Sequence, residues 1–181
     1  MIRILGMLLA ALVIGAAAHV TPALAQSDPQ NTLVLETTKG PVVIRLRNDL
    51  APGHAERIKQ LTRDGFYNNV PFHRVIPGFM AQTGDGERGD GRGKSKYPNI
   101  KAEFSQVPFK RGVIGMARAS DPNSANCQFF ITYADAPHLN GQYTVIGEVV
   151  SGMDNVDKLK KGEPVTDPDR ITRASIQADK K

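Results

Sequence analysis

After Gly65 the chain breaks into short apolar segments that are shorter than an ordinary globular helix. Glycine, proline and asparagine separate these segments, and such residues favour turns over continuous helix. The spacing therefore predicts many short antiparallel strands rather than alternating strands and helices. The segments are residues 70–76, 79–83, 112–117, 128–133 and 143–150.

The residues before Gly65 predict a hairpin and a helix. Residues 33–37 and 42–47 alternate and are rich in β-branched side chains, and a turn-forming stretch separates them. Pro52 then suits the first turn of a helix that Gly65 can end. The hairpin thus adds two strands to those that follow.

The C-terminal part predicts one more helix and one more strand. Met153, Val156 and Leu159 make a short helical stripe that ends before Gly162, and residues 171–177 have a strand pattern. We therefore expect a mainly β domain, a closed eight-stranded antiparallel β-barrel capped by two α-helices.

The first 25 residues have the pattern of a signal peptide. Arg3 precedes the apolar run 4–18, and Ala23-Leu24-Ala25 has the small-x-small form of a cleavage site. No later segment has the roughly 20 apolar residues of a membrane span. We expect cleavage after Ala25 and an exported protein, periplasmic or secreted, that has no membrane association after cleavage.

The remaining chain predicts one domain. We expect a disordered lead-in at 26–31, a single domain at 32–178 and a polar tail at 179–181. Removing the leader removes Arg3 and no acidic residue, so the formal charge falls from +5 to +4. The basic stretches 88–96 and 158–161 are interrupted and lack interleaved aromatic residues, so we expect no nucleic-acid partner.

The glycine-rich residues 84–95 resemble two phosphate-binding motifs without completing either. Gly84, Gly86 and Gly89 match G-x-G-x-x-G, but Gly91 and Pro98 forbid the helix that must follow. Gly93-Lys94-Ser95 lacks the glycine that a phosphate loop needs at residue 88. These residues therefore predict an exposed loop and no nucleotide cofactor.

Metal and thiol chemistry are also disfavoured. His54, His73 and His138 do not pair with a histidine or cysteine at metal-ligand spacing, so we expect no metal. Cys127 lies within the apolar run 127–131, which favours a small buried residue over a nucleophile.

Eight short motifs, in order, resemble those of the cyclophilins, which are peptidyl-prolyl cis/trans isomerases. They span nearly all of residues 32–178. The motifs are GFY at 65–67, FHRVIP at 72–77, GFMAQTGD at 78–85, GKS at 93–95, GMA at 115–117, NCQFFI at 126–131, LNG at 139–141 and GEV at 147–149.

The resemblance implies a substrate site for proline-containing polypeptides. It makes Arg74 the catalytic residue and places an apolar slot for the proline ring at Phe79, Met80, Phe130 and Leu139. The other implied substrate-binding residues are Gln82, Ala117, Arg118, Ala119, Gln128, His138 and Tyr143.

The chemistry of the reaction suits this residue set. An X-Pro bond isomerises over about 18–20 kcal/mol, and a catalyst needs only to bind the twisted amide better than either planar isomer. An apolar slot excludes water from the amide, while Arg74 can donate to the proline nitrogen once twisting restores its lone pair. A charged donor contributes about 1.5–3 kcal/mol, or one to two powers of ten in rate.

Three positions depart from the best-known eukaryotic cyclophilins. His138 replaces a tryptophan at the slot edge, Tyr143 replaces a histidine, and Arg118 replaces a peptide-contacting asparagine. Because the tryptophan helps to bind cyclosporin, we expect weak cyclosporin binding.

Two alternatives to the enzyme remain open from the sequence. The chain could be a proline-peptide binding module or holdase in which catalysis is incidental. It could also be a structural barrel in which the slot residues only pack the core, as phenylalanines in strands usually do.

Overall fold

The computed structural model describes residues 28–180. The predicted signal peptide, 1–25, lies outside the described residues. Within the predicted lead-in, Pro29–Asn31 form a short 3-10 turn, and the side chain of Asp28 accepts a hydrogen bond from the backbone N–H of Gln30. None of the helices in residues 28–180 is long and apolar enough to cross a membrane.

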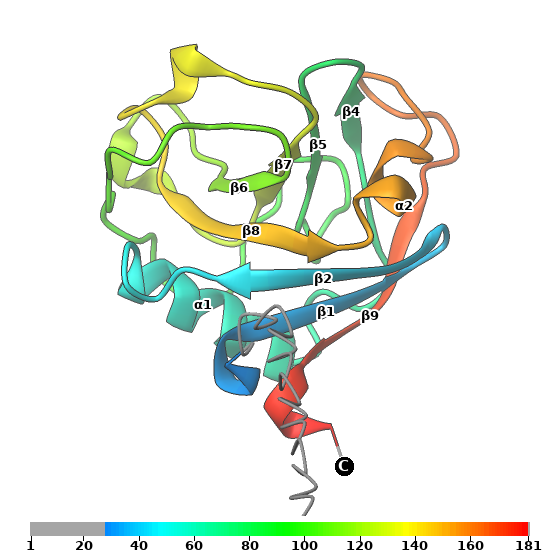
Figure 1. The fold of residues 1–181 in the computed structure, drawn as a ribbon. Coiled ribbons are helices and arrows are strands. Elements are labelled where there is room, and N and C mark those ends of the chain that lie inside the picture. Colours follow the sequence, from blue (N-terminus) through cyan, green and yellow to red (C-terminus); the bar gives the residue numbers. More distant parts are fainter. Residues whose placement is uncertain (1–27, 181) are drawn as a thin grey trace, which may run out of the picture.

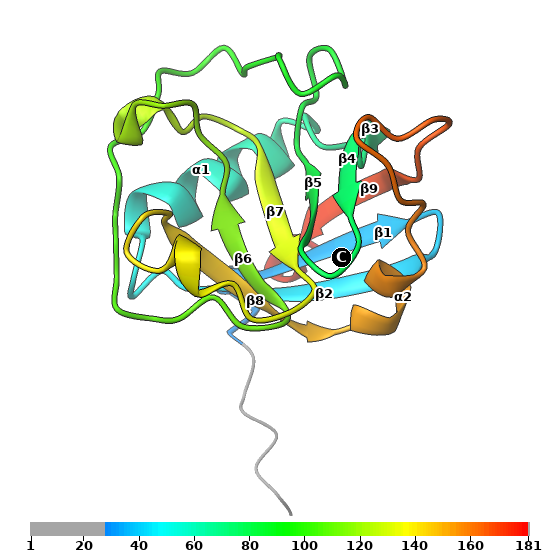
Figure 2. The same cartoon turned by 90° about the horizontal axis from the view of Figure 1, so that it is seen from above.

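The described residues form one curled antiparallel sheet with the strand order β3-β9-β1-β2-β8-β6-β7-β5-β4 (Figures 1 and 2). The sheet bends until its two edge strands, β3 and β4, come close, with only two residues between them in the chain. The strands are β1 (Thr32–Thr37), β2 (Gly40–Leu46), β3 (Val70–Pro71), β4 (Arg74–Ile76), β5 (Met80–Thr83), β6 (Val113–Met116), β7 (Phe129–Thr132), β8 (Val145–Ser151) and β9 (Arg170–Ile176).

The mainly β, antiparallel fold is confirmed, while the strand count and closure differ from the expectation. The sheet has nine strands instead of eight, and no ladder joins β3 to β4 within residues 28–180. The predicted strand 70–76 is split because β3 pairs with β9 whereas β4 pairs with β5. Phe72 and His73 change the direction of the chain between these two partners.

Helix α1 (Pro52–Arg63) begins at the predicted proline and lies across one open end of the curled sheet. Its first turn is capped from a distant loop, because the Glu103 carboxylate accepts the backbone N–H groups of Gly53 and His54, both at 3.0 Å. Ile58 and Leu61 are buried in the core. The apolar residues that predicted this helix therefore lie on its inward face.

Helix α2 (Met153–Asp157) is shorter than the stripe that predicted it. Val156 and Leu159 are buried and Met153 packs against the core, but the helix ends at Asp157. The second predicted helix therefore exists as little more than one turn.

The two faces of the curled sheet carry different clusters. The inner face holds the main core, to which Val75, Ala81 and Ile131 contribute. Because successive strand residues point to opposite faces, Arg74, Gln82 and Phe130 lie on the outer face. A second, smaller cluster gathers there, with Met80, Phe109, Phe130, Ala136, Leu139 and Val145 buried in it.

Candidate functional site

Residues that pair across neighbouring strands form a row at right angles to the strands, called the transverse row below. This row brings the predicted catalytic residue next to an apolar surface. Antiparallel pairing sets Arg74 opposite Gln82, Gln82 opposite Phe130, and Phe130 opposite Gly115. A Cβ on Gly115 would lie 2.3 Å from the Phe130 ring, so only glycine leaves room for that ring. The register therefore places the guanidinium group and the aromatic ring on the same face, with one residue between them.

The apolar slot, formed by Phe79, Met80, Phe130 and Leu139, opens on this outer face as part of a groove of about 520 Å³. Met80, Phe130 and Leu139 are each 5% exposed or less and make its floor. His138 packs against Phe79 at its edge, with 5.3 Å between the ring centroids.

Tyr143 closes another side of the groove. Its ring meets that of Phe130 edge to face at 5.7 Å, and the Arg118 guanidinium lies over it at 4.5 Å from Cζ to the ring centroid. Arg118 also donates to the backbone carbonyls of Ala119 at 2.9 Å and Gln142 at 3.0 Å. Arg118 thus ties together the two loops that border the groove.

A chain of polar contacts runs from Arg74 along the rim. Its Nη1 lies 3.5 Å from the side-chain oxygen of Gln82, and the Gln82 amide donates to Gln128 at 3.0 Å. On the other side, the Nε of Arg74 donates to the carboxylate of Glu163. The Arg74 side chain is 36% exposed, so it stays accessible from the groove.

The glycine-rich loop next to the groove folds around its own carboxylate. Asp85 accepts the backbone N–H groups of Arg88, Gly91 and Gly93 at 2.8–2.9 Å. Burial tends to raise the pKa of Asp85, but these backbone hydrogen bonds outweigh it and the pKa is lowered. As expected from the sequence, no helix follows this loop.

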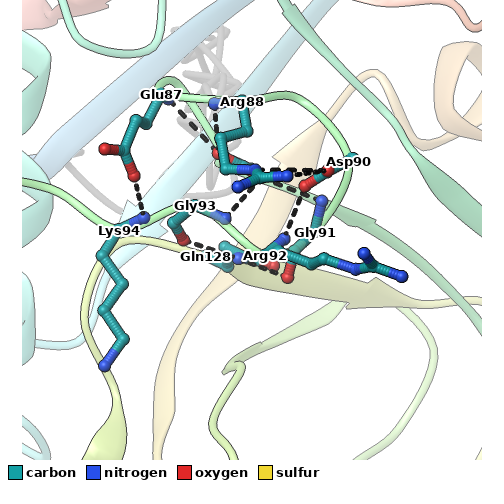
Figure 3. Close-up of polar contacts among 9 residues, drawn as sticks. Glu87, Arg88, Asp90, Gly91, Arg92, Gly93, Lys94 and Gln128 are labelled. Atoms are coloured by element: carbon teal, nitrogen blue, oxygen red, sulfur yellow. Dashed lines mark hydrogen bonds and ion pairs between the residues drawn. The ribbon is translucent and has the colours of Figure 1, made fainter.

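Figure 3 shows the surrounding contacts of this loop. Arg88 pairs with Asp90, the backbone N–H of Lys94 donates to Glu87, and Gln128 donates to the carbonyls of Gly91 and Gly93. Gln128 is therefore fixed between the loop and Gln82.

A second, smaller pocket of about 250 Å³ lies between this loop and residues 117–119. It shares Gln82, Ala117 and Arg118 with the groove, so the two hollows adjoin. Arg92 and Lys94 lie on its other side. Its lining is mostly polar and backbone, unlike that of the apolar slot.

All twelve residues predicted from the sequence line these two hollows, and their roles remain predictions. Ala119 and Gln128 line the smaller pocket alone, and nine of the others line the groove together with Arg74. The sequence did not indicate Gln142, Arg92 or Lys94. Gln142 adjoins Tyr143 and could have been included, whereas no spacing pointed to the two basic residues.

Cys127 lines the smaller pocket, whereas the buried His54 and His73 line neither hollow. Burial raises the pKa of the Cys127 thiol to about 12, which keeps it protonated and unreactive near neutral pH. His73 is buried against Gly91, and its two ring nitrogens have no hydrogen-bond partner within the described residues. Residues 28–180 hold no group of three side chains suited to a metal ion.

Comparison of the sequence with family models matches residues 32–176 to the family described as "Cyclophilin type peptidyl-prolyl cis-trans isomerase/CLD". A Brucella suis protein named "Probable peptidyl-prolyl cis-trans isomerase" is 55% identical over 170 residues, covering 86% of this chain and 87% of its own length. An Aspergillus fumigatus "Peptidyl-prolyl cis-trans isomerase-like 1" is 39% identical over 154 residues, covering 80% of this chain and 94% of its own.

Solved structures show the same fold. The cyclophilin AquaCyp293 from Hirschia baltica has a TM-score of 0.79 at 29% identity, covering 85% of this chain and 76% of its own. A Cryptosporidium parvum cyclophilin type peptidyl-prolyl cis-trans isomerase, crystallised in the presence of the dipeptide ala-pro, has a TM-score of 0.74 at 29% identity. That match covers 80% of this chain and 98% of the other.

Proposed function

The chain belongs to the cyclophilin family and is a peptidyl-prolyl cis-trans isomerase, and we propose that it accelerates X-Pro isomerisation in exported polypeptides during their folding. The family match and the relatives' names favour this enzyme over the binding module and over the structural barrel. The observation that carries the proposed site is the transverse row that sets Arg74 beside Gln82 and Phe130.

The proline ring of the substrate enters the apolar slot in this proposal. Burying the ring against Met80, Phe130 and Leu139 removes water from the neighbouring amide, and this weakens the solvation that favours the planar forms. The ala-pro dipeptide present with the Cryptosporidium parvum structure supports a proline-containing peptide as the ligand.

Arg74 acts on the twisted amide. As the C–N bond rotates, the nitrogen lone pair is no longer shared with the carbonyl and becomes a hydrogen-bond acceptor. Arg74 lines the groove, and its terminal nitrogens, one of which contacts Gln82 at 3.5 Å, can donate to this lone pair. Because this contact strengthens only on twisting, it lowers the barrier instead of tightening ground-state binding.

The test replaces Arg74 with alanine and follows cis/trans exchange of an Ala-Pro-Phe type peptide by NMR exchange spectroscopy. We expect kcat/KM to fall by about ten- to hundredfold, because a charged donor contributes about 1.5–3 kcal/mol. Arg45→Ala is a matched control, since Arg45 is also half-exposed and paired with a carboxylate but lies outside the groove. A wild-type rate in Arg74→Ala would remove Arg74 from the mechanism.

Export rests on the pattern of the first 25 residues. The run 4–18 and the Ala23-Leu24-Ala25 site support a cleaved leader and a periplasmic or secreted protein. Mass spectrometry of the protein recovered from a periplasmic extract should give an N-terminus at Gln26. Recovery of the uncleaved chain from the cytoplasm would contradict export and leave the isomerase assignment unchanged.

We expect weak cyclosporin binding because His138 lies at the edge of the groove. His138 packs against Phe79 at a tilt, where a tryptophan would offer a larger apolar surface and an N–H donor. His138→Trp should therefore tighten cyclosporin binding measured by calorimetry. A nanomolar dissociation constant for the unchanged protein would overturn this expectation.

A further inference from the structure

The outer edge of β4 is covered by the segment between α2 and β9. The backbone N–H of Val75 donates to the carbonyl of Gly162 at 2.8 Å, and Gly162 donates back to Val75 at 2.9 Å. The backbone N–H of Val165 also donates to the carbonyl of His73 at 3.0 Å. The residues on both sides of Arg74 are therefore fixed to this segment by main-chain hydrogen bonds.

This pairing determines which residue faces Arg74. Val75 and Gly162 form an isolated antiparallel bridge, which brings Glu163, the residue after Gly162, next to Arg74, the residue before Val75. The Nε of Arg74 donates to the Glu163 carboxylate. Arg74 therefore lies between Glu163 on one side and Gln82 on the other.

The segment that carries Glu163 is held in place at its ends. The buried carboxylate of Asp169 accepts the backbone N–H of Lys160 at 2.8 Å and the hydroxyl of Thr38 at 2.8 Å. Lys39 adds an ion pair to Asp169 at 3.3 Å. Glu163 is therefore presented by a braced loop, although its own side chain is 55% exposed.

The two contacts of Arg74 differ in strength. The Nη1 contact with Gln82, at 3.5 Å, is at the outer limit of a hydrogen bond. The contact between Nε and Glu163 joins two opposite charges, whereas Gln82 offers a neutral amide oxygen, so the Glu163 contact is the stronger of the two. The Glu163 contact occupies the nitrogen nearest the backbone and uses neither terminal nitrogen.

We propose that Glu163 is a positioning residue for the reaction, which fixes the guanidinium of Arg74 so that its terminal N–H groups point into the groove. The inference rests on the proposed role of Arg74. Glu163 does not line the groove, so it acts through Arg74 and not on the substrate. Its loss should lower the population of correctly oriented Arg74 and leave the affinity of the apolar slot for proline unchanged.

The experiment compares wild type, Glu163→Gln, Glu163→Asp and Arg74→Ala by NMR exchange spectroscopy over a range of peptide concentrations. Glu163→Gln should lower kcat about two- to fivefold, the range that an exposed ion pair can supply, with KM unchanged. Glu163→Asp keeps the charge on a shorter arm and should recover part of the loss. High salt should bring the wild type toward Glu163→Gln while changing Glu163→Gln little.

Glu148→Gln is the matched control. It is the same substitution in a carboxylate that pairs with the half-exposed Arg45, outside both hollows, and it should leave kcat unchanged. A second readout is the Nε–Hε resonance of Arg74, identified by its absence from Arg74→Ala. In Glu163→Gln this resonance should shift and its proton should exchange faster with water.

The outcomes separate this inference from the proposed function. If Arg74→Ala is slow but Glu163→Gln matches Glu148→Gln, the positioning role is wrong and the proposed mechanism stands. If Arg74→Ala keeps the wild-type rate, the proposed mechanism fails first. If Glu163→Gln raises KM or lowers the melting temperature without changing kcat, Glu163 serves only structure, which also overturns the inference.

Discussion

Phe129 and Phe130 are neighbours in β7, yet they belong to different regions of the molecule. Phe129 points inward, is 1% exposed and meets the ring of Tyr67 edge to face in the main core. Phe130 points outward into the smaller cluster under the groove, where it stacks on Phe109. Strand alternation therefore lets one sheet contribute to the core with one face and to the groove with the other.

The main core and the smaller outer cluster differ in how completely protein encloses them. The inner cluster is surrounded by the curled sheet and α1, so its side chains contact protein on every side. The outer cluster has protein beneath it, but its upper surface is the open groove. Substitutions on the inner face should thus be measured mainly in stability, and those on the outer face mainly in activity.

The largest effect is expected for Phe129→Ala. Removing a fully enclosed ring leaves a cavity in the main core, and such changes cost about 3–5 kcal/mol. Denaturant unfolding should show this loss in the free energy of unfolding, while kcat/KM of the molecules that remain folded should change little. A loss of less than about 1 kcal/mol would show that the inner cluster can collapse around the missing ring, contrary to its enclosure.

Phe130→Ala should reverse the pattern. The change removes the floor of the apolar slot, so we expect kcat/KM to fall by about ten- to hundredfold, from the roughly 1.5–3 kcal/mol of a buried apolar side chain. Its stability loss should be smaller than that of Phe129→Ala, because the space left by the ring would open onto the groove and admit water, instead of staying as an enclosed cavity. Equal stability losses in the two variants would contradict the distinction between the two regions.

The sequence predicted a strand here but not the face on which each of these two residues lies. Phe129, Phe130 and Ile131 are apolar in succession, so the pattern could not say which residues point to the core and which to the groove. The register with β5 and β6 decides this, and register depends on partners that are distant along the chain.

The sequence motifs predicted which residues gather around the groove better than the hydrophobic pattern predicted the closure of the sheet. Arg74, Gln82 and Phe130 each belong to a short contiguous motif of the sequence. The pairing of β4, β5 and β7 brings these three residues together. Glu163 lies 89 positions from Arg74 and belongs to no recognisable spacing. Its place follows only from the bridge between Val75 and Gly162, which the sequence pattern did not reveal.

The smallest effect concerns two buried histidines that belong to neither cluster. His54 lies at the start of α1, fully buried, with its Nδ1 2.6 Å from the Glu103 carboxylate. Burial lowers its pKa below the ordinary value of 6.5, and nearby Arg57 lowers it further, although Glu103 acts in the opposite direction. His73, under the glycine-rich loop, likewise has a pKa lowered by burial, against the opposing charges of Asp85 and Asp90.

Protonation of either histidine in mild acid should lower the free energy of unfolding. A pKa that is lower in the folded state means that the unfolded chain binds more protons once the pH falls below about 6.5. The histidine contribution to the free energy of unfolding should therefore be fully present above that pH and decrease below it, as measured by urea unfolding at successive pH values. His54→Gln and His73→Gln should each flatten this decrease, because neither glutamine binds a proton. A slope unchanged in both variants would assign the acid sensitivity to the carboxylates instead.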